Sequence, residues 1–265
     1  MRISSTDNSI YRRLKQLATS ARACRDAHRT LIEGVHLLQA ALAAHAPIHT
    51  LVLRGAEQSA EAVALVPRAE KQSKAKLIEL ASALYDAISP VEHGAGVLAE
   101  IEFETPPWPK QIVDDAIYLD NVQDPGNVGT LLRTAAAAGV RHAIGGAGCA
   151  FFWSPKVMRA GMGAHFVLDL HEQITPRAVR DAFAGEILAA DAIEGEDLFA
   201  AEWGSDATVW VFGGEGQGLT AETLLAANRR LRIPIDSRVE SLNVGAAAAV
   251  CLFEQKRRRL ARDSR

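Results

Sequence analysis

The hydrophobic positions of the first hundred residues alternate between two spacings. Apolar residues that recur every three or four positions predict helices, and short apolar runs predict strands. The helices are expected over residues 8–22, 30–45, 55 to about 66, and 75–84. The strands are expected over residues 49–54 and 96–101. This mixture predicts a small α/β domain over residues 1–102.

A proline-rich segment then separates this domain from a second pattern. Three prolines lie within residues 106–109 and favour a linker over residues 103–110. Short apolar strands are expected beyond it over residues 116–120, 141–144, 186–190, 208–212 and 231–235. Helices are expected over 127–139, where Gly139 ends the helix, from Pro155, over 176–184 and over 242–261. Buried strands that alternate with helices predict an α/β domain over residues 111–265, with a mostly parallel sheet and flanking helices.

The charge of the chain is unevenly distributed. The whole sequence of 265 residues has a formal net charge of −3, which by itself argues against a nucleic-acid partner. Residues 1–29, however, contain seven basic and two acidic residues, and residues 256–265 contain six basic and one acidic. The segment between them has 16 basic and 29 acidic residues. Two basic ends on an acidic body are compatible with RNA as a partner.

Several classes of protein are disfavoured by what the sequence lacks. The three cysteines are widely spaced, and the eight histidines form no metal-binding pattern, so we expect neither disulfides nor a metal. The first residues lack the apolar stretch of a secretory signal. The longest apolar run, residues 244–253, is well short of a membrane span. We therefore expect a cytoplasmic protein without membrane contact.

Three polar segments follow predicted strands. Residues 120–133 contain a Pro-Gly turn and Asn127, which we expect to cap the next helix. Residues 212–219 contain the run Gly-Gly-Glu-Gly-Gln-Gly, which lacks the dinucleotide-binding spacing and whose Glu would repel a pyrophosphate. Residues 233–245 include Pro234, which fits only the edge or end of a strand, and Ser241, which we expect to cap the last helix. Ligands bind at the carboxyl ends of parallel strands, although a capped turn, a flexible turn and a helix–sheet contact remain alternatives.

Together, these segments resemble the three motifs of the SpoU/TrmH-type RNA 2′-O-ribose methyltransferases of the SPOUT superfamily. The matching residues are 124–133, 213–219, and 233–235 with 241–244, and residues 154–164 resemble the stretch that connects the first two motifs. The first hundred residues resemble the N-terminal substrate-binding domain of that family, which has a ribosomal-protein-like α/β fold. The resemblance implies a trefoil-knotted catalytic domain, S-adenosylmethionine as methyl donor without a metal, and a homodimer with active sites at the subunit interface.

The resemblance also implies roles for particular residues. Gly213, Ile233 and Leu242 match cofactor-binding positions, and four residues match polar positions of the active site. These four are Asn127, Glu215, Ser241 and Asn243. Arg133 matches the catalytic arginine of the family. Because a guanidinium stays protonated, we hypothesise that Arg133 holds the adjacent phosphate and stabilises the developing alkoxide rather than acting as a base.

The substrate implied by the resemblance is RNA, most of all ribosomal RNA. Six basic residues near the N-terminus are candidate RNA contacts, with a solvated helix face as the alternative. They are Arg12, Arg13, Lys15, Arg22, Arg25 and Arg29. A transfer-RNA enzyme or an antibiotic-resistance rRNA methylase of the same family is an alternative. A catalytically silent RNA-binding protein is opposed by the intact polar positions, and a nucleotide-dependent oxidoreductase by the missing fingerprint.

Overall fold

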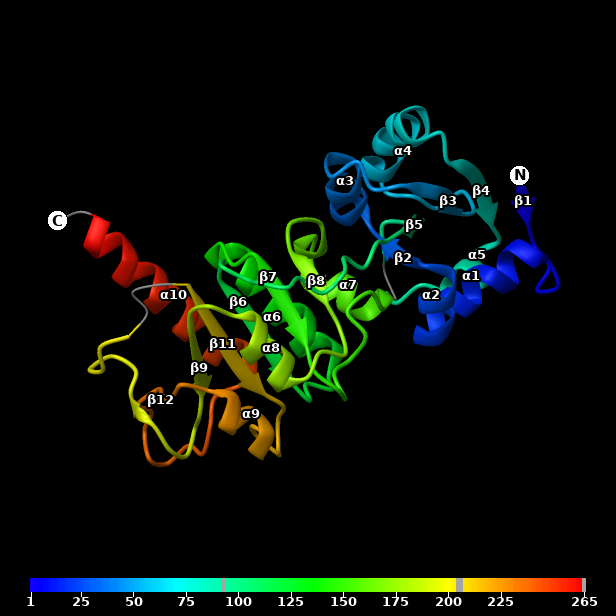
Figure 1. The fold of residues 1–265 in the computed structure, drawn as a ribbon. Helices are drawn as coiled ribbons and strands as arrows, with labels where there is room; N and C mark the ends of the chain where they lie inside the picture. The colour runs from blue at the N-terminus through cyan, green and yellow to red at the C-terminus, as the bar shows by residue number, and fades with distance from the viewer. Residues whose placement is uncertain (92–93, 204–206, 264–265) are drawn as a thin grey trace. The chain divides into compact units, whose positions relative to one another are not determined.

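The computed structural model describes residues 1–91, 94–203 and 207–263, and they form two compact units (Figure 1). The first unit contains residues 1–104 and 153–166, and the second contains residues 105–152 and 167–265. The segment 153–166 lies within the range that the sequence analysis assigns to the catalytic domain. None of the helices in the described ranges is long and apolar enough to cross a membrane.

The first unit is built on a five-stranded sheet with the order β1-β4-β3-β5-β2. Its strands are β1 (Arg2–Ile3), β2 (Arg29–Glu33), β3 (Ile48–Arg54), β4 (Lys76–Leu80) and β5 (Val97–Glu102). Its helices are α1 (Ser9–Thr19), α2 (Ala21–Ala27), α3 (Val35–Ala43), α4 (Ala60–Ser73), α5 (Ser82–Asp86) and α7 (Pro155–Gly161), with a 3₁₀ turn over Ala164–Phe166. β5 runs antiparallel to β2 and β3, whereas β1, β4 and β3 are parallel.

Three of the predicted helices in this unit are wrong in part. The helix expected over 30–45 begins only after Gly34, which has φ +96°, and the preceding residues form β2 against β5. The helix expected over 75–84 is β4 followed by α5, because a short apolar run cannot be assigned by periodicity alone. The helix expected over 8–22 is divided at Ser20, which ends α1 and caps α2 with its side chain.

The second unit contains a fully parallel sheet of seven described strands in the order β10-β12-β9-β11-β6-β7-β8. The strands are β6 (Ala116–Asp120), β7 (His142–Gly145), β8 (Asp169–His171), β9 (Glu186–Ala190), β10 (Glu196–Asp197), β11 (Thr208–Gly213) and β12 (Arg229–Arg232). The helices are α6 (Pro125–Ala138), α8 (Pro176–Ala182), α9 (Ala221–Ala226) and α10 (Val244–Asp263). The predicted α/β class with a mostly parallel sheet is confirmed.

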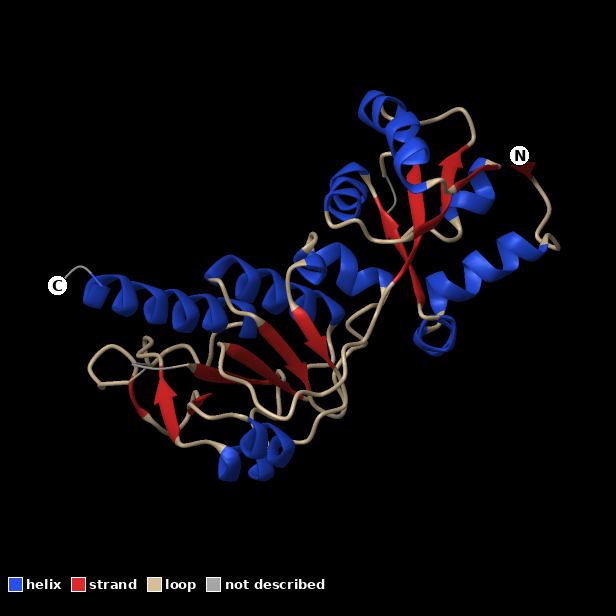
Figure 2. Cartoon of the chain, turned by 45° about the horizontal axis from the view of Figure 1, so that its top comes forward, coloured by secondary structure: helices blue, strands red, loops and turns tan. Residues whose placement is uncertain are grey.

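Helices cover both faces of this sheet (Figure 2). On one face, Tyr118, Val209 and Val211 pack with Val179 of α8 and with Phe183, which directly follows α8. On the other face lie α6 and α10, and Trp210 Nε1 donates a 2.5 Å hydrogen bond to Gln255 Oε1 of α10. The central strands are buried throughout, which is why they read as continuous apolar runs in the sequence.

Most of the strands and helices predicted for the second unit lie close to their predicted ranges. The strands expected over 116–120 and 186–190 match β6 and β9, and Gly139 ends α6 with φ +90°. The last strand is displaced, since β12 ends at Arg232 rather than at residue 235. Pro234 therefore lies beyond the strand, where no ladder hydrogen bond is required of it.

Candidate active site

The turn from β6 into α6 places the first polar segment at the carboxyl edge of the sheet. Asp124, not Asn127, caps α6, because its Oδ1 accepts a 2.8 Å hydrogen bond from the Asn127 backbone N–H. Pro125 occupies the first helical position, which proline favours. The Asn127 side chain is therefore available for another contact.

The glycine-rich loop after β11 folds back tightly beside this turn. A Cβ on Gly213 would lie 2.4 Å from the carbonyl carbon of Gly218, and a Cβ on Gly214 would lie 2.3 Å from the carbonyl oxygen of Asn121. Gly214 and Gly218 also form a bridge with each other. Glycine is therefore required at both positions by close backbone approach, and the loop presents Glu215 at its turn.

Asn243 joins the three segments. Its Nδ2 donates to Asn127 Oδ1 at 3.0 Å and to Glu215 Oε1 at 2.8 Å. Its Oδ1 accepts from the backbone N–H groups of Gly245 at 2.9 Å and Ala246 at 3.4 Å, so Asn243 and not Ser241 caps α10. One amide therefore both starts the last helix and orients two side chains that are far away in the sequence.

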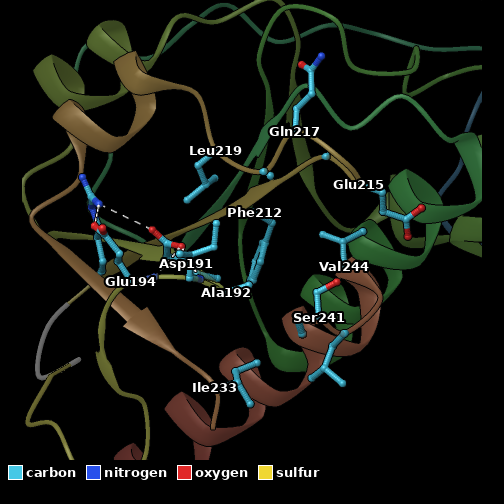
Figure 3. Close-up of a pocket in the computed structure, with 18 of the residues that line it drawn as sticks. Asp191, Ala192, Glu194, Phe212, Glu215, Gln217, Leu219, Ile233, Ser241 and Val244 are labelled. Carbon is cyan, nitrogen blue, oxygen red and sulfur yellow. Dashed lines mark hydrogen bonds and ion pairs between the residues drawn. The ribbon is translucent and has the colours of Figure 1, made fainter. Parts of the chain in front are cut away.

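A cavity of about 660 Å³ opens beside this cluster. It is lined by residues 190–194, 212–219, 224, 230, 231, 233, 235, 240–242, 244 and 247. The predicted cofactor residues Gly213, Ile233 and Leu242 line it, as do Glu215 and Ser241. Figure 3 shows Phe212, Leu219 and Val244 around the middle of the pocket. Apolar walls with a few polar groups are typical of a small-molecule site.

The far side of the cavity carries charged residues that the sequence analysis missed. Arg230 forms an ion pair with Glu194 at 2.7 Å and lies 3.9 Å from Asp191. Asp191 Oδ1 also accepts from the backbone N–H groups of Ile193 and Glu194. In Figure 3, Asp191 and Glu194 lie on the opposite side of the pocket from Glu215. Their position in the sequence could have indicated them, because Asp191 directly follows β9 and so lies at the carboxyl edge of the sheet.

A smaller cavity of about 240 Å³ adjoins the first. It is lined by residues 121–124, 127, 214, 215 and 217, and it shares Gly214, Glu215 and Gln217 with the large cavity. Glu215 therefore lies between the two cavities, and Asn127 lines the smaller one.

Cys149 lies close to these loops but is chemically unsuited to act as a nucleophile. Its Sγ contacts the Leu119 carbonyl oxygen at 3.1 Å, and burial raises the pKa of the thiol above its ordinary value. A protonated thiol is a poor nucleophile. Among the described residues, no group of three or more His, Cys, Asp or Glu side chains could hold a metal ion.

Arg133 is not brought into the cluster within one chain. It lies on α6 six residues after Asn127, a rise of about 9 Å along the helix axis, and its side chain is exposed. It forms no hydrogen bond or ion pair with the described residues. Ser241 is also exposed at the cavity wall, without a hydrogen bond to any residue in the described ranges.

The six candidate RNA contacts fall into two groups. Arg13 and Arg29 bind the fully buried carboxylate of Glu100 at 2.9 and 3.3 Å, and Thr50 donates to the same group at 2.7 Å. The side chains of the other four are exposed: Arg12, Lys15, Arg22 and Arg25. Arg22 has a helical ion pair with Asp26 at 3.6 Å. Two of the six basic residues, Arg13 and Arg29, therefore stabilise the sheet of the first unit.

Comparisons with known proteins cover both units. The model of the SpoU rRNA Methylase family matches residues 115–253, and the model of the MRM3-like substrate binding domain matches residues 8–99. An uncharacterized tRNA/rRNA methyltransferase of Synechocystis sp. is 32% identical over 98% of this chain and 94% of its own length. The 23S rRNA guanosine 2′-O-methyltransferase RlmP of Bacillus subtilis is 26% identical over 95% of this chain and 97% of its own.

Solved structures agree with these matches. The AdoMet-bound rRNA methyltransferase of Sinorhizobium meliloti superposes with a TM-score of 0.83 at 26% identity, over 97% of this chain and 98% of its own. The SpoU methyltransferase AviRb of Streptomyces viridochromogenes, in complex with AdoMet, has a TM-score of 0.84 over 96% of this chain and 98% of its own. At 23% identity, the latter match shows a common fold.

Proposed function

The chain belongs to the SpoU rRNA methylase family and is an S-adenosylmethionine-dependent RNA 2′-O-methyltransferase, and we propose that it methylates ribosomal RNA at the Asn127–Glu215–Asn243 cluster. The observation that carries this proposal is the amide of Asn243, which holds Asn127 at the smaller cavity and Glu215 at the wall that the two cavities share. RlmP and the rRNA methyltransferase of S. meliloti support ribosomal RNA as the substrate class.

The large cavity fits S-adenosylmethionine. Phe212, Leu219 and Ile233 offer apolar walls for the adenine ring. Gly216 and Gly218 have open space where a side chain would begin, so the backbone of the glycine-rich loop can approach a ligand closely. When bound, the cofactor supplies the electrophilic methyl group at its sulfonium. Glu215 and Asp191 add negative charge at two sides of the cavity, which favours a cationic ligand.

The cluster would position the acceptor. Glu215 Oε1 is held by Asn243, so the carboxylate is fixed and can accept a hydrogen bond from a ribose 2′-hydroxyl. Fixing the hydroxyl in line with the methyl group removes much of the entropic part of the barrier. Arg133 would bind the neighbouring phosphate and stabilise the negative charge that develops on the 2′-oxygen as its proton passes along the hydrogen bond to the Glu215 carboxylate.

A second copy of the chain would complete this site. Arg133 is exposed and distant from Asn127 within one chain, so we assign it to the cluster of the other subunit in a homodimer. Phe253 on α10 is 45% exposed and offers apolar surface for such a contact. We also propose that the catalytic domain forms a trefoil knot. Residues between 233 and 247 line the cavity together with two earlier loops, 190–194 and 212–219, and this placement supports a knot.

The first unit would recognise the RNA. We assign residues 1–102 to RNA substrate binding, 103–110 to a linker and 111–265 to the catalytic domain, in agreement with the ranges of the two family models. The exposed side chains of Arg12, Lys15, Arg22 and Arg25 supply the positive charge that contacts to phosphates need. A cytoplasmic location fits the three free cysteines.

The test is a map of 2′-O-methylation across total RNA, incubated with S-adenosylmethionine and either the wild-type protein or Glu215→Gln. We expect one or a few nucleotides to be methylated by the wild type alone. Isothermal titration should show binding of S-adenosylmethionine and not of NAD. Cofactor binding without methylation of any RNA would indicate a catalytically silent protein, and methylation of transfer RNA alone would reassign the substrate.

A further inference from the structure

The smaller cavity has a lining that the methyl-transfer step does not account for. Besides Asn127 and Glu215, it carries the amide side chains of Asn121, Gln123 and Gln217. Its volume of about 240 Å³ is little more than a third of the 660 Å³ of the large cavity. It is therefore too small for a second ligand of the same size and suits a single ring system.

The three amides are linked to one another. Gln123 Nε2 donates to Asn121 Oδ1 at 3.1 Å, and Asn121 Nδ2 donates to Gln217 Oε1 at 3.3 Å. Every amide carries both donors and an acceptor, so each end of this chain keeps free hydrogen-bonding capacity. Gln123 and Gln217 are exposed side chains, and in Figure 3 Gln217 points away from Leu219 and the apolar part of the pocket.

The backbone around Asn121 is shaped to hold this chain of amides. Asn121 adopts the left-handed conformation with φ +55°, which asparagine tolerates better than most residues. A Cβ on Gly148 would lie 2.2 Å from Asn121 Oδ1, and the Asn121 carbonyl oxygen leaves no room for a Cβ on Gly214. An unusual backbone conformation that two glycines accommodate is typical of functional sites.

We propose that the smaller cavity binds the base of the RNA nucleotide that is methylated, and that Asn121, Gln123 and Gln217 determine which base is accepted. The proposal rests on the proposed function, because Glu215, which lines both cavities, must hold the ribose of the same nucleotide. An enzyme that acts on one nucleotide gains specificity by turning its base into a pocket and binding the hydrogen-bonding edge of that base. Neutral amides suit this role since they can match donors and acceptors without a net charge.

The experiment uses full-length protein and ribosomal RNA transcripts that carry each of the four bases at the nucleotide found in the methylation map. The variants are Gln123→Ala, Gln217→Ala and Asn121→Gly, the last of which removes the amide while keeping a residue that adopts positive φ readily. The matched control is Gln111→Ala, an exposed glutamine of the same unit that lines neither cavity. Initial rates give kcat/KM for each base, and isothermal titration gives the Kd of S-adenosylmethionine.

We expect the wild type and Gln111→Ala to prefer one base, and the three variants to reduce the preference ratio by about tenfold or more, which corresponds to one lost base contact. The Kd of S-adenosylmethionine should stay within about twofold in Asn121→Gly and Gln123→Ala, whose residues line the smaller cavity and not the large one. An unchanged preference ratio, or a wild type without base preference, would overturn the proposal. A weaker cofactor affinity in these two variants would instead assign the smaller cavity to the cofactor. Absence of methylation on every transcript is a distinct result that contradicts the proposed function itself.

Discussion

Asn243 performs two tasks that a single substitution can separate. Its Oδ1 caps α10, and its Nδ2 holds Asn127 and Glu215. Asn243→Ala removes both, whereas Asn243→Asp keeps an oxygen for the cap but replaces the donor by a carboxylate that faces Glu215. We expect Asn243→Asp to lower kcat about 100-fold or more, because a misplaced reacting group costs about this much, and to leave the melting temperature nearly unchanged.

The magnitude of the stability effect follows from the two roles. Loss of an Asn cap costs about 1 kcal/mol, and about 1 kcal/mol shifts the melting temperature of a domain of this size by about 2–4 °C. Asn243→Ala should therefore melt a few degrees below the wild type. Asn243→Asp should not, because aspartate caps helices as well as asparagine does and Glu215, being exposed, can turn away from the new charge.

The assay is the initial rate of methyl transfer to ribosomal RNA at saturating S-adenosylmethionine, together with thermal unfolding of each variant. Thr175→Ala is the matched control, since Thr175 caps α8 by accepting from the Ala178 N–H at 3.2 Å and lines neither cavity. It should lose stability and keep kcat. A wild-type kcat in Asn243→Asp would refute the reasoning, because the orienting donor would then be dispensable.

Three further predictions concern charged side chains. Arg133→Ala should lower kcat about 100-fold or more with an unchanged melting temperature. Arg133→Lys should recover little of the lost kcat, and wild-type turnover of Arg133→Lys would exclude bidentate binding of the phosphate. Reversal of charge at Arg12, Lys15 and Arg22 should weaken RNA binding and flatten its dependence on salt by about one unit of slope per lost phosphate contact, as filter binding at several salt concentrations would show. Hydrogen bonds from Arg257 and Arg258 lower the pKa of Glu254 to about 2. The ion pairs of Glu254 therefore stabilise the fold fully above the ordinary pKa of about 4.3, and this stabilisation is lost as the pH falls toward 2. Glu254→Gln should therefore lower the melting temperature at pH 7, and this difference should shrink between about pH 4 and pH 2.

The sequence predicted the second unit better than the first for a physical reason. β6 and β9 are short runs of buried apolar residues between turn residues, and no helix of normal length fits between those turns. In β4, by contrast, Ile78 and Leu80 alternate with more exposed residues over only five positions. Such a run fits a helix as well as a strand, and pairing with β3, distant in the sequence, decides between them.

The resemblance to the SpoU/TrmH family is confirmed, yet its motifs did not predict the internal geometry of the site. The first and third motifs each contained two residues able to cap a helix, and the expected cap was wrong in both. Asp124 could have been identified from Pro125, because proline favours the first helical position. Asn243 could not, since Ser241 and Asn243 are equally suitable by type. The hydrogen bonds of Asn243 to Asn127 and Glu215 join residues more than a hundred and nearly thirty positions away, and only the folded chain shows them.

The two basic ends of the chain, which look alike in the sequence, are used differently by the fold. At the C-terminal end, Arg257 and Arg258 bind Glu254, and Arg259 binds Asp115. Arg258 also lies over the Trp203 ring at 4.5 Å. These arginines are held against the acidic body, so their charge is largely compensated before any RNA approaches. At the N-terminal end, Glu100 binds Arg13 and Arg29, and Arg22 has an exposed ion pair with Asp26 that contributes little. The salt dependence of RNA binding should therefore respond to the exposed basic residues of α1 and α2 far more than to those of α10.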